Sequence, residues 1–148
     1  MVPEQIEREI VIDAPVARVW DVLTQTEHVQ QWFAFDGAEI DLRPGGAMVM
    51  RWQEHGTYHA RIALIEPPRL FAYRAAQIEG ELPHDGNSTL VEFTLSAEGD
   101  GTRLRVVESG FRGLDIPEAE RAAQVQASIE GWQGAFSTLG EYAARVAA

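Results

Sequence analysis

Three side chains on different predicted strands could act as acids, bases or hydrogen-bond anchors: His59, Tyr73 and Glu108. Glu108 shares the parity of Leu104 and Val106, which would direct its carboxylate toward the interior of the fold. A bulge at 109–110 would instead turn Glu108 to solvent, and this is the orientation that the sequence favours. The three residues are the first candidates for catalysis, but the sequence does not assign a catalytic role to any of them.

The histidines and the missing residue types exclude several kinds of chemistry. His55 and His59 are four residues apart, but Gly56 and a hairpin turn lie between them and no third ligand follows at a suitable spacing. We therefore expect no metal site, and we expect His28 and His84 at the surface. The chain contains neither cysteine nor lysine, which removes thiol nucleophiles, Cys-based zinc sites, Schiff-base chemistry and the Walker phosphate loop. No cofactor is expected.

Seven aromatic residues are predicted to face the interior, from strands or from the inner stripe of the last helix. Core packing explains each of them alone. Together, and with Glu108, they are predicted to line a largely apolar ligand pocket that has a few polar anchors. These aromatic residues are Trp52, Tyr58, Tyr73, Phe93, Phe111, Trp132 and Phe136.

Arg51, Arg61 and Arg74 lie on neighbouring predicted strands. We expect them to form ion pairs across the outer face of the sheet. An inward arginine could instead bind a ligand carboxylate with two hydrogen bonds, and Arg51 or Arg74 would be the best placed for it. The expected partners on the outer face are Glu39, Glu54 and Glu92.

A sheet and several helices must position these candidates. Alternating apolar residues predict a first strand over residues 6–13. A Pro-Gly-Gly turn, a Pro-Pro pair and an Asp-Gly turn separate the later strands, and short turns make such strands antiparallel. The polar stretch 77–88 is predicted as the longest loop. The later strands are predicted at 35–42, 47–53, 57–65, 70–76, 90–97 and 102–108.

Three helices are predicted: one after Pro15, a short one that carries Trp32 and Phe33, and a long amphipathic one over residues 117–148. Gly131, Gly134 and Gly140 interrupt the long helix, and each costs about 1 kcal/mol relative to alanine. Close approach to the sheet or room for a ligand would offset that cost.

The composition indicates one α+β domain over residues 1–148. The net charge of -11 disfavours nucleic acid and anionic membrane surfaces as partners. The acidic, polar start contains no apolar signal segment, and no stretch is long and apolar enough to span a membrane. We therefore expect a cytoplasmic protein that is a monomer or a homodimer.

Several short motifs, taken in order, resemble the START-like or SRPBCC superfamily. The resemblance runs over residues 6–143 and is strongest to proteins similar to the C-terminal domain of the activator of the heat-shock-protein-90 ATPase. It implies a helix-grip fold, in which a curved antiparallel sheet of about seven strands holds the long C-terminal helix over a cavity. The motifs include Ile12-Asp13-Ala14-Pro15, Val19-Trp20, Trp32-Phe33, Pro44-Gly45-Gly46, Glu66-Pro67-Pro68, Gly101-Thr102-Arg103-Leu104, Ser109-Gly110-Phe111 and Gly131-Trp132.

The resemblance leaves three functions open, because members of this superfamily include lipid and hormone binders, polyketide cyclases and aromatases, and co-chaperone domains. We favour a bacterial protein that binds a small hydrophobic or amphipathic ligand in the cavity. A polyketide cyclase-like or aromatase-like enzyme is the first alternative. The second is a stress-response co-chaperone with a chaperone partner, which would need an exposed apolar patch around Trp32, Phe33 and Phe35.

Overall fold

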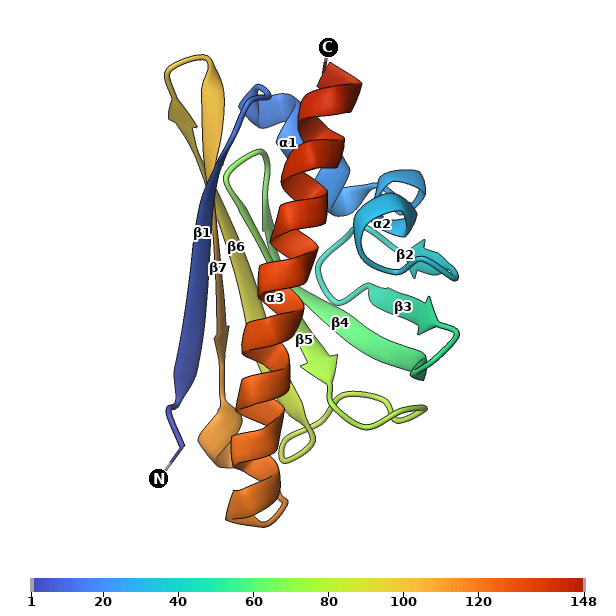
Figure 1. The fold of residues 1–148 in the computed structure, drawn as a ribbon. Helices are drawn as coiled ribbons and strands as arrows, with labels where there is room; N and C mark the ends of the chain where they lie inside the picture. The colour runs from blue at the N-terminus through green and yellow to red at the C-terminus, as the bar shows by residue number, and fades with distance from the viewer. Residues whose placement is uncertain (1, 148) are drawn as a thin grey trace.

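The second to seventh strands follow one another along the chain and pair antiparallel, as the turn residues predict, and the first strand also pairs antiparallel with the seventh. The computed structural model describes residues 2–147 and is shown in Figure 1. The strand order is β1-β7-β6-β5-β4-β3-β2, so the first strand pairs with the last. The strands are β1 (Gln5–Ile12), β2 (Ala38–Ile40), β3 (Ala47–Trp52), β4 (Gly56–Glu66), β5 (Leu70–Ala76), β6 (Ser88–Glu98) and β7 (Gly101–Ser109).

Three helices cover one face of this curved sheet. Helices α1 (Val16–Thr24) and α2 (Thr26–Trp32) follow β1 directly, and α3 (Glu118–Ala147) runs along the length of the sheet (Figure 1). The long helix packs on β1, α1 and α2. The predicted helix-grip fold is therefore confirmed. The predicted helix end at residue 148 lies outside the described residues.

Two local predictions differ from the structure. The strand predicted over 35–42 is reduced to β2, because Gly37 takes φ +134° and the Asp36 carboxylate accepts a hydrogen bond from the Gln53 N–H at 2.6 Å. The predicted bulge near 109–111 is also wrong. Strand β7 runs to Ser109 in unbroken register with β6, and Gly110 at φ +98° then starts a 3-10 turn.

The main core lies between the sheet and the helices. Its largest fully buried side chains include Phe71, Phe93 and Phe136, and burial of each contributes about 1.5–3 kcal/mol. A second, smaller cluster joins Phe111 to Val125 in the first turns of α3. The two clusters contact different parts of the helix.

The glycines of α3 fall into two kinds. A Cβ built on Gly140 would lie 3.5 Å from Cδ1 of Ile10, so the helix approaches β1 closely there. A Cβ on Gly131 or Gly134 would meet nothing within 4 Å. The distance at Gly140 is an ordinary van der Waals contact, so packing does not require glycine at any of the three positions.

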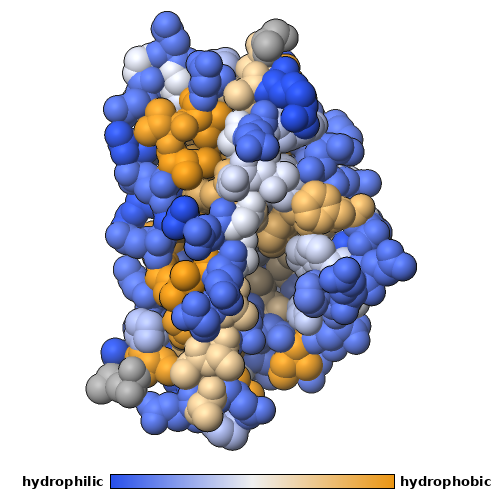
Figure 2. Space-filling model, in the orientation of Figure 1, coloured by the Kyte–Doolittle hydropathy of each residue, from blue (hydrophilic) through white to orange (hydrophobic). Residues whose placement is uncertain are grey.

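The outer face of the sheet is polar. Arg103 pairs with Glu9 and Glu98, and Arg105 pairs with Glu7. Figure 2 shows apolar side chains gathered instead beside α3, including a strip between the helix and β1. Within residues 2–147, no helix combines the length and the apolar character that crossing a membrane requires.

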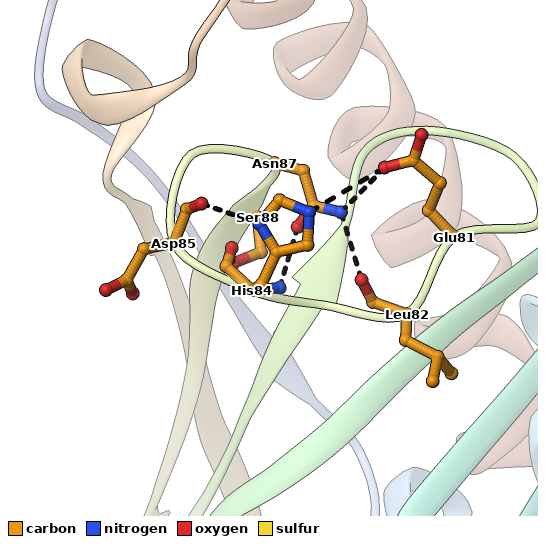
Figure 3. Close-up of polar contacts among 6 residues, drawn as sticks. All are labelled: Glu81, Leu82, His84, Asp85, Asn87 and Ser88. Atoms are coloured by element: carbon orange, nitrogen blue, oxygen red, sulfur yellow. Dashed lines mark hydrogen bonds and ion pairs between the residues drawn. The ribbon is translucent and has the colours of Figure 1, made fainter.

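The loop between β5 and β6 is held together by the side chain of Asn87, which is 3% exposed (Figure 3). Its amide oxygen accepts from the His84 N–H at 2.8 Å, and its amide nitrogen donates to the Leu82 carbonyl and to the Glu81 carboxylate, each at 3.0 Å. The Asn87 carbonyl in turn accepts from the Gln77 N–H at 2.8 Å. The predicted polar loop is thus a fixed structure that anchors Gln77.

Candidate functional site

A cavity of about 390 Å³ lies under the first half of α3, between the helix and strands β3 to β7. Its volume falls in the range of about 300–1,000 Å³ that small-molecule sites occupy. Figure 2 shows recessed apolar side chains on the side of the helix that faces β3 and β4. The lining residues are Phe33, Met50, Trp52, His55, Tyr58, His59, Tyr73, Ala75, Ala76, Gln77, Val91, Glu108, Gln124, Ala127, Ser128, Gly131 and Trp132.

The cavity exists because α3 presents small or slender side chains to it. Gln124, Ala127, Ser128 and Gly131 follow one another at intervals of three, one and three residues, which places them on one helix face. Phe136, on the same side one turn beyond Trp132, fills the interior instead. The cavity therefore lies under part of the first half of the helix, whereas core side chains pack under the second half.

Aromatic rings form a fixed wall of the cavity. Phe33 stacks on Trp132 with ring centroids 5.5 Å apart and planes at 8°, and it meets Trp52 edge to face at 5.0 Å. The Trp52 Nε1–H donates to the Phe33 carbonyl at 2.7 Å, and its ring contacts Tyr58 at 5.9 Å. These contacts hold the rings in place, so a ligand would meet a surface that is already ordered.

Glu108 is buried at 4% exposure, so the orientation to solvent that we favoured from the sequence is wrong. Strand β7 alternates strictly between buried and half-buried residues, and Glu108 continues the buried set of Leu104 and Val106. Its Oε2 accepts from the Thr89 hydroxyl at 2.6 Å, and its Oε1 accepts from the Trp132 Nε1–H at 2.9 Å. Both donors are neutral, and together they fix the carboxylate in the cavity wall.

The Glu108 contacts belong to a longer path of hydrogen bonds that starts and ends on α3. The Gln124 amide donates to the Gln77 amide oxygen at 2.5 Å, and the Gln77 amide nitrogen donates to the Thr89 hydroxyl at 3.0 Å. Thr89 donates to Glu108, which Trp132 contacts from the helix. The path ties the helix to β6, β7 and the end of β5 around one side of the cavity.

Tyr73 lies two strands from Glu108 in the same row of the sheet, with Val91 between them. Burial, and secondarily the charge of Glu108, raises the pKa of the Tyr73 phenol. Among residues 2–147, no hydrogen-bond partner contacts this phenol, and Tyr73 lines the cavity. It is therefore a protonated group that can donate to a ligand or accept from one.

The structure brings together most of the predicted site residues on the cavity wall. Three predicted residues do not reach it: Phe93 and Phe136 pack in the main core, and Phe111 belongs to the second cluster. The inward parity of these residues identifies the buried face but not the position along it. The predicted residues that line the cavity are Trp52, Tyr58, His59, Tyr73, Glu108 and Trp132.

Sequence reasoning considered ligand room at Gly131 but missed the polar amides and the other small residues of the wall. The spacing of Ala127, Ser128 and Gly131 on a helix with larger apolar neighbours could have indicated the hollow face. Gln77 and Gln124 are 47 residues apart, and no local pattern signals their contact. Phe33, which only the co-chaperone alternative placed in a surface patch, lines the cavity.

The histidines and arginines divide between the cavity and the surface. Among residues 2–147, no group of three or more His, Asp or Glu side chains could hold a metal ion. His28, expected at the surface, is half-buried with its Nδ1 2.6 Å from the Tyr142 hydroxyl. Arg51 pairs with Glu39 at 2.6 Å, as predicted.

Arg61 and Arg74 do not show the ion pairs predicted for them. They lie opposite each other in the register of β4 and β5, and Arg74 donates to the Ser88 hydroxyl at 3.5 Å. Neither they nor Arg51 line the cavity. The inward arginine that we considered from the sequence is therefore absent from the described cavity wall.

The apolar patch that a co-chaperone role would require does not form around the predicted residues. Trp32 is 3% exposed and donates its Nε1–H to the Val22 carbonyl at 2.8 Å. Phe33 lines the cavity, which leaves Phe35, at 57% exposure, alone on the surface. These residues give that hypothesis no support.

Comparisons with known proteins agree on the family and the fold. A family model described as activator of Hsp90 ATPase homolog 1-like protein matches residues 13–144. Protein MLL2253 from Mesorhizobium loti is 22% identical, with a TM-score of 0.77 over 95% of this chain and 97% of that chain. Among curated proteins, none matches this sequence.

Two further solved structures are similar. CalU16 from Micromonospora echinospora is 27% identical, with a TM-score of 0.69 over 94% of this chain and 75% of that chain. DynU16, a protein in the dynemicin biosynthetic locus, is 21% identical, with a TM-score of 0.71 over 95% of this chain and 47% of that chain. At these identities, MLL2253 and DynU16 show the fold alone.

Proposed function

The chain belongs to the family of activator of Hsp90 ATPase homolog 1-like proteins, and within that family we propose that it binds a small apolar or amphipathic molecule in the cavity under α3. The observation that carries the proposal is a cavity of about 390 Å³ with ordered aromatic walls. A few polar groups, Tyr73, Gln77 and Glu108, lie among those walls and could orient the ligand.

The arrangement of the walls favours binding because little order has to be created when a ligand enters. Phe33, Trp52 and Trp132 already contact one another, and Glu108 is already held by two donors. Each side chain that is fixed in advance saves about 0.5–1.5 kcal/mol of ordering cost. The free energy of burying the ligand's apolar surface is then available for affinity.

A fluorescence titration tests this proposal directly. N-phenyl-1-naphthylamine is a neutral apolar probe that accepts excitation energy from tryptophan. We expect saturable energy transfer with one probe per chain, and we expect Trp52→Phe and Trp132→Phe each to reduce it. Trp20→Phe is the matched control, because Trp20 packs on Phe71 away from the cavity lining. Transfer that does not saturate, or that falls equally in all three variants, would contradict a ligand site in the cavity.

An enzyme is the second candidate function, and one observation favours it: His59, Tyr73 and Glu108 all line the same cavity. Cyclisation of a polyketide-like chain needs a shaped cavity, a base and the exclusion of water. A base would remove a proton from carbon beside one carbonyl, and the resulting carbanion would attack a second carbonyl of the same chain. Protonation of the alkoxide and loss of one water molecule would complete the ring.

A simple diketone tests this second candidate. 2,6-Heptanedione closes to 3-methylcyclohex-2-enone with loss of water, and the enone is followed by its ultraviolet absorbance. The enzyme hypothesis expects a saturable rate above that of buffer, which Glu108→Gln or His59→Asn reduces. A rate equal to buffer, or one that survives both substitutions, would remove the enzyme hypothesis for this substrate class and leave the binding proposal intact.

A further inference from the structure

Resting on the proposed binding function, we propose that the ligand carries a protonated amine or a comparable cationic group, which Glu108 and the surrounding aromatic rings hold. The same site would discriminate against ligands that carry a carboxylate. The juxtaposition that carries this inference is a buried carboxylate without a cationic partner inside an aromatic-walled cavity.

The charges on the cavity wall are one-sided. Glu108 is the single acidic residue among the described residues that line the cavity, and no arginine lies beside it. The other titratable side chains of the lining are His55, His59, Tyr58 and Tyr73. Among residues 2–147, no ion pair involves Glu108, although exposed carboxylates of the sheet do pair with arginines.

The Glu108 carboxylate also has capacity for further partners. An ionised carboxylate offers about four lone-pair directions, and Thr89 and Trp132 each use one. A buried charge is costly unless an opposite charge or further donors compensate it. A cation in the cavity would provide this compensation, because charge-assisted hydrogen bonds are about twice as strong as neutral ones.

Aromatic faces add a second reason to expect a cation. The faces of Trp, Tyr and Phe rings carry negative quadrupole density, which attracts ammonium groups within about 6 Å of the ring centre and disfavours anions. Phe33, Trp52, Tyr58, Tyr73 and Trp132 all line the cavity. The rings and the carboxylate therefore select the same sign of charge.

Three ligands with one apolar body test the inference. 4-Phenylbutylamine is a cation at pH 7, 4-phenylbutan-1-ol is neutral, and 4-phenylbutanoate is an anion. We would measure their dissociation constants by isothermal titration calorimetry at about 0.15 M salt, where the Debye length is about 8 Å. We expect the amine to bind about tenfold more tightly than the alcohol, and the anion to bind more weakly than both.

Two variants separate the site from the overall acidity of the chain. Glu108→Gln should bring the amine to within about twofold of the alcohol, because glutamine removes the negative charge, keeps the shape and can still accept from Trp132. Glu130→Gln makes the same change in net charge on an exposed part of α3 outside the cavity lining, and it should preserve the tenfold preference. A cooperative thermal unfolding transition confirms that Glu108→Gln is folded.

The outcomes distinguish this inference from the binding proposal on which it rests. If the alcohol binds and the amine binds no better, the cation inference is overturned while the binding proposal stands. Tightest binding by the anion would also overturn it, and would indicate that His55 or His59 governs the charge preference. A preference for the amine that persists in Glu108→Gln but falls in Glu130→Gln would assign the effect to surface charge and reject the site. If none of the three binds or displaces N-phenyl-1-naphthylamine, the cation inference fails, and the binding proposal fails with it only if that probe does not saturate either.

Discussion

Gly131 and Gly134 offer the sharpest test of the hollow under α3. Both lie inside the long helix, three residues apart, and a Cβ built on either would meet nothing within 4 Å. Both glycines are exposed, but Gly131 lines the cavity and Gly134 does not. The two positions share the same backbone chemistry and differ in what a side chain would enter.

Alanine at either position should stabilise the protein. Glycine in a helix interior costs about 1 kcal/mol relative to alanine, and no steric cost opposes the gain where the added Cβ has free space. The expected rise in the free energy of unfolding is therefore about 1 kcal/mol for each variant. For a chain of this size the gain corresponds to an increase of about 2–4 °C in Tm.

Leucine should separate the two positions by their effect on binding. At position 131 the larger side chain would stand beside the cavity of about 390 Å³ that this residue lines, whereas position 134 lies outside the cavity lining. Extra atoms in space that the bound probe already fills cost about 1–3 kcal/mol. Gly131→Leu should therefore weaken the binding of N-phenyl-1-naphthylamine by about tenfold or more. Gly134→Leu should leave the affinity within about twofold of the unsubstituted protein.

Urea unfolding and the fluorescence titration measure these effects on the same four variants. A loss of stability in Gly131→Ala would mean that the space above this glycine is not free. Equal affinities of the two leucine variants would refute the view that Gly131 is kept for ligand room. Helix propensity alone predicts equal behaviour at both positions, so any difference in binding must come from the cavity.

Three other substitutions test other parts of the structure. The raised pKa of Tyr73 keeps its phenol protonated in the folded state while the unfolded chain loses that proton near pH 10, so stability should fall as pH rises above about 10. Tyr73→Phe should remove this part of the alkaline decline in urea unfolding between about pH 9 and 11; an unchanged decline would contradict the burial of that phenol. Asn87→Ala should lower the free energy of unfolding by about 1–3 kcal/mol, because it leaves polar groups of the β5–β6 loop without hydrogen-bond partners. It should also speed hydrogen exchange at the Gln77 amide, and unaltered exchange there would show that the loop does not depend on Asn87. Phe93→Ala should lower the free energy of unfolding, measured with urea, by about 3–5 kcal/mol and leave the m-value unchanged. A loss below about 1 kcal/mol would contradict the place of Phe93 in the core.

The order of elements was predictable because each boundary has a local signal. The Asp-Gly turn before β7 and the proline before α3 are examples, and both elements form where the sequence predicts. Strand β2 was overestimated because Gly37 and the Asp36 contact act through backbone geometry that periodicity does not report. Turn residues mark where an element ends more reliably than apolar residues mark how far it extends.

The site was harder to predict, because a cavity is a property of the whole fold. The alternation of residues along the strand would have placed Glu108 inward. We favoured the outward orientation because we interpreted Gly110 as part of a bulge, but Gly110 lies after the end of the strand. Phe93 and Phe136 show the converse error: their side chains face inward, yet they fill the interior where the helix carries large residues. The contact between Gln77 and Gln124 joins segments far apart in the chain and has no sequence signature.

The pairing of the first strand with the last has a consequence for how the chain is made. Residues of β1 register with residues about a hundred positions later, such as Gln5 with Ser109 and Ile12 with Thr102. During synthesis on a ribosome, β1 has no partner until β7 has emerged, while β3 to β6 can already form a meander. Closing so long a loop costs conformational entropy, and this cost slows the pairing of β1 with β7. The last steps of folding should therefore wait until the C-terminal third of the chain has been made. We expect nascent chains halted before β7 to leave the amides of β1 unprotected from hydrogen exchange, and protection at that stage would contradict this order.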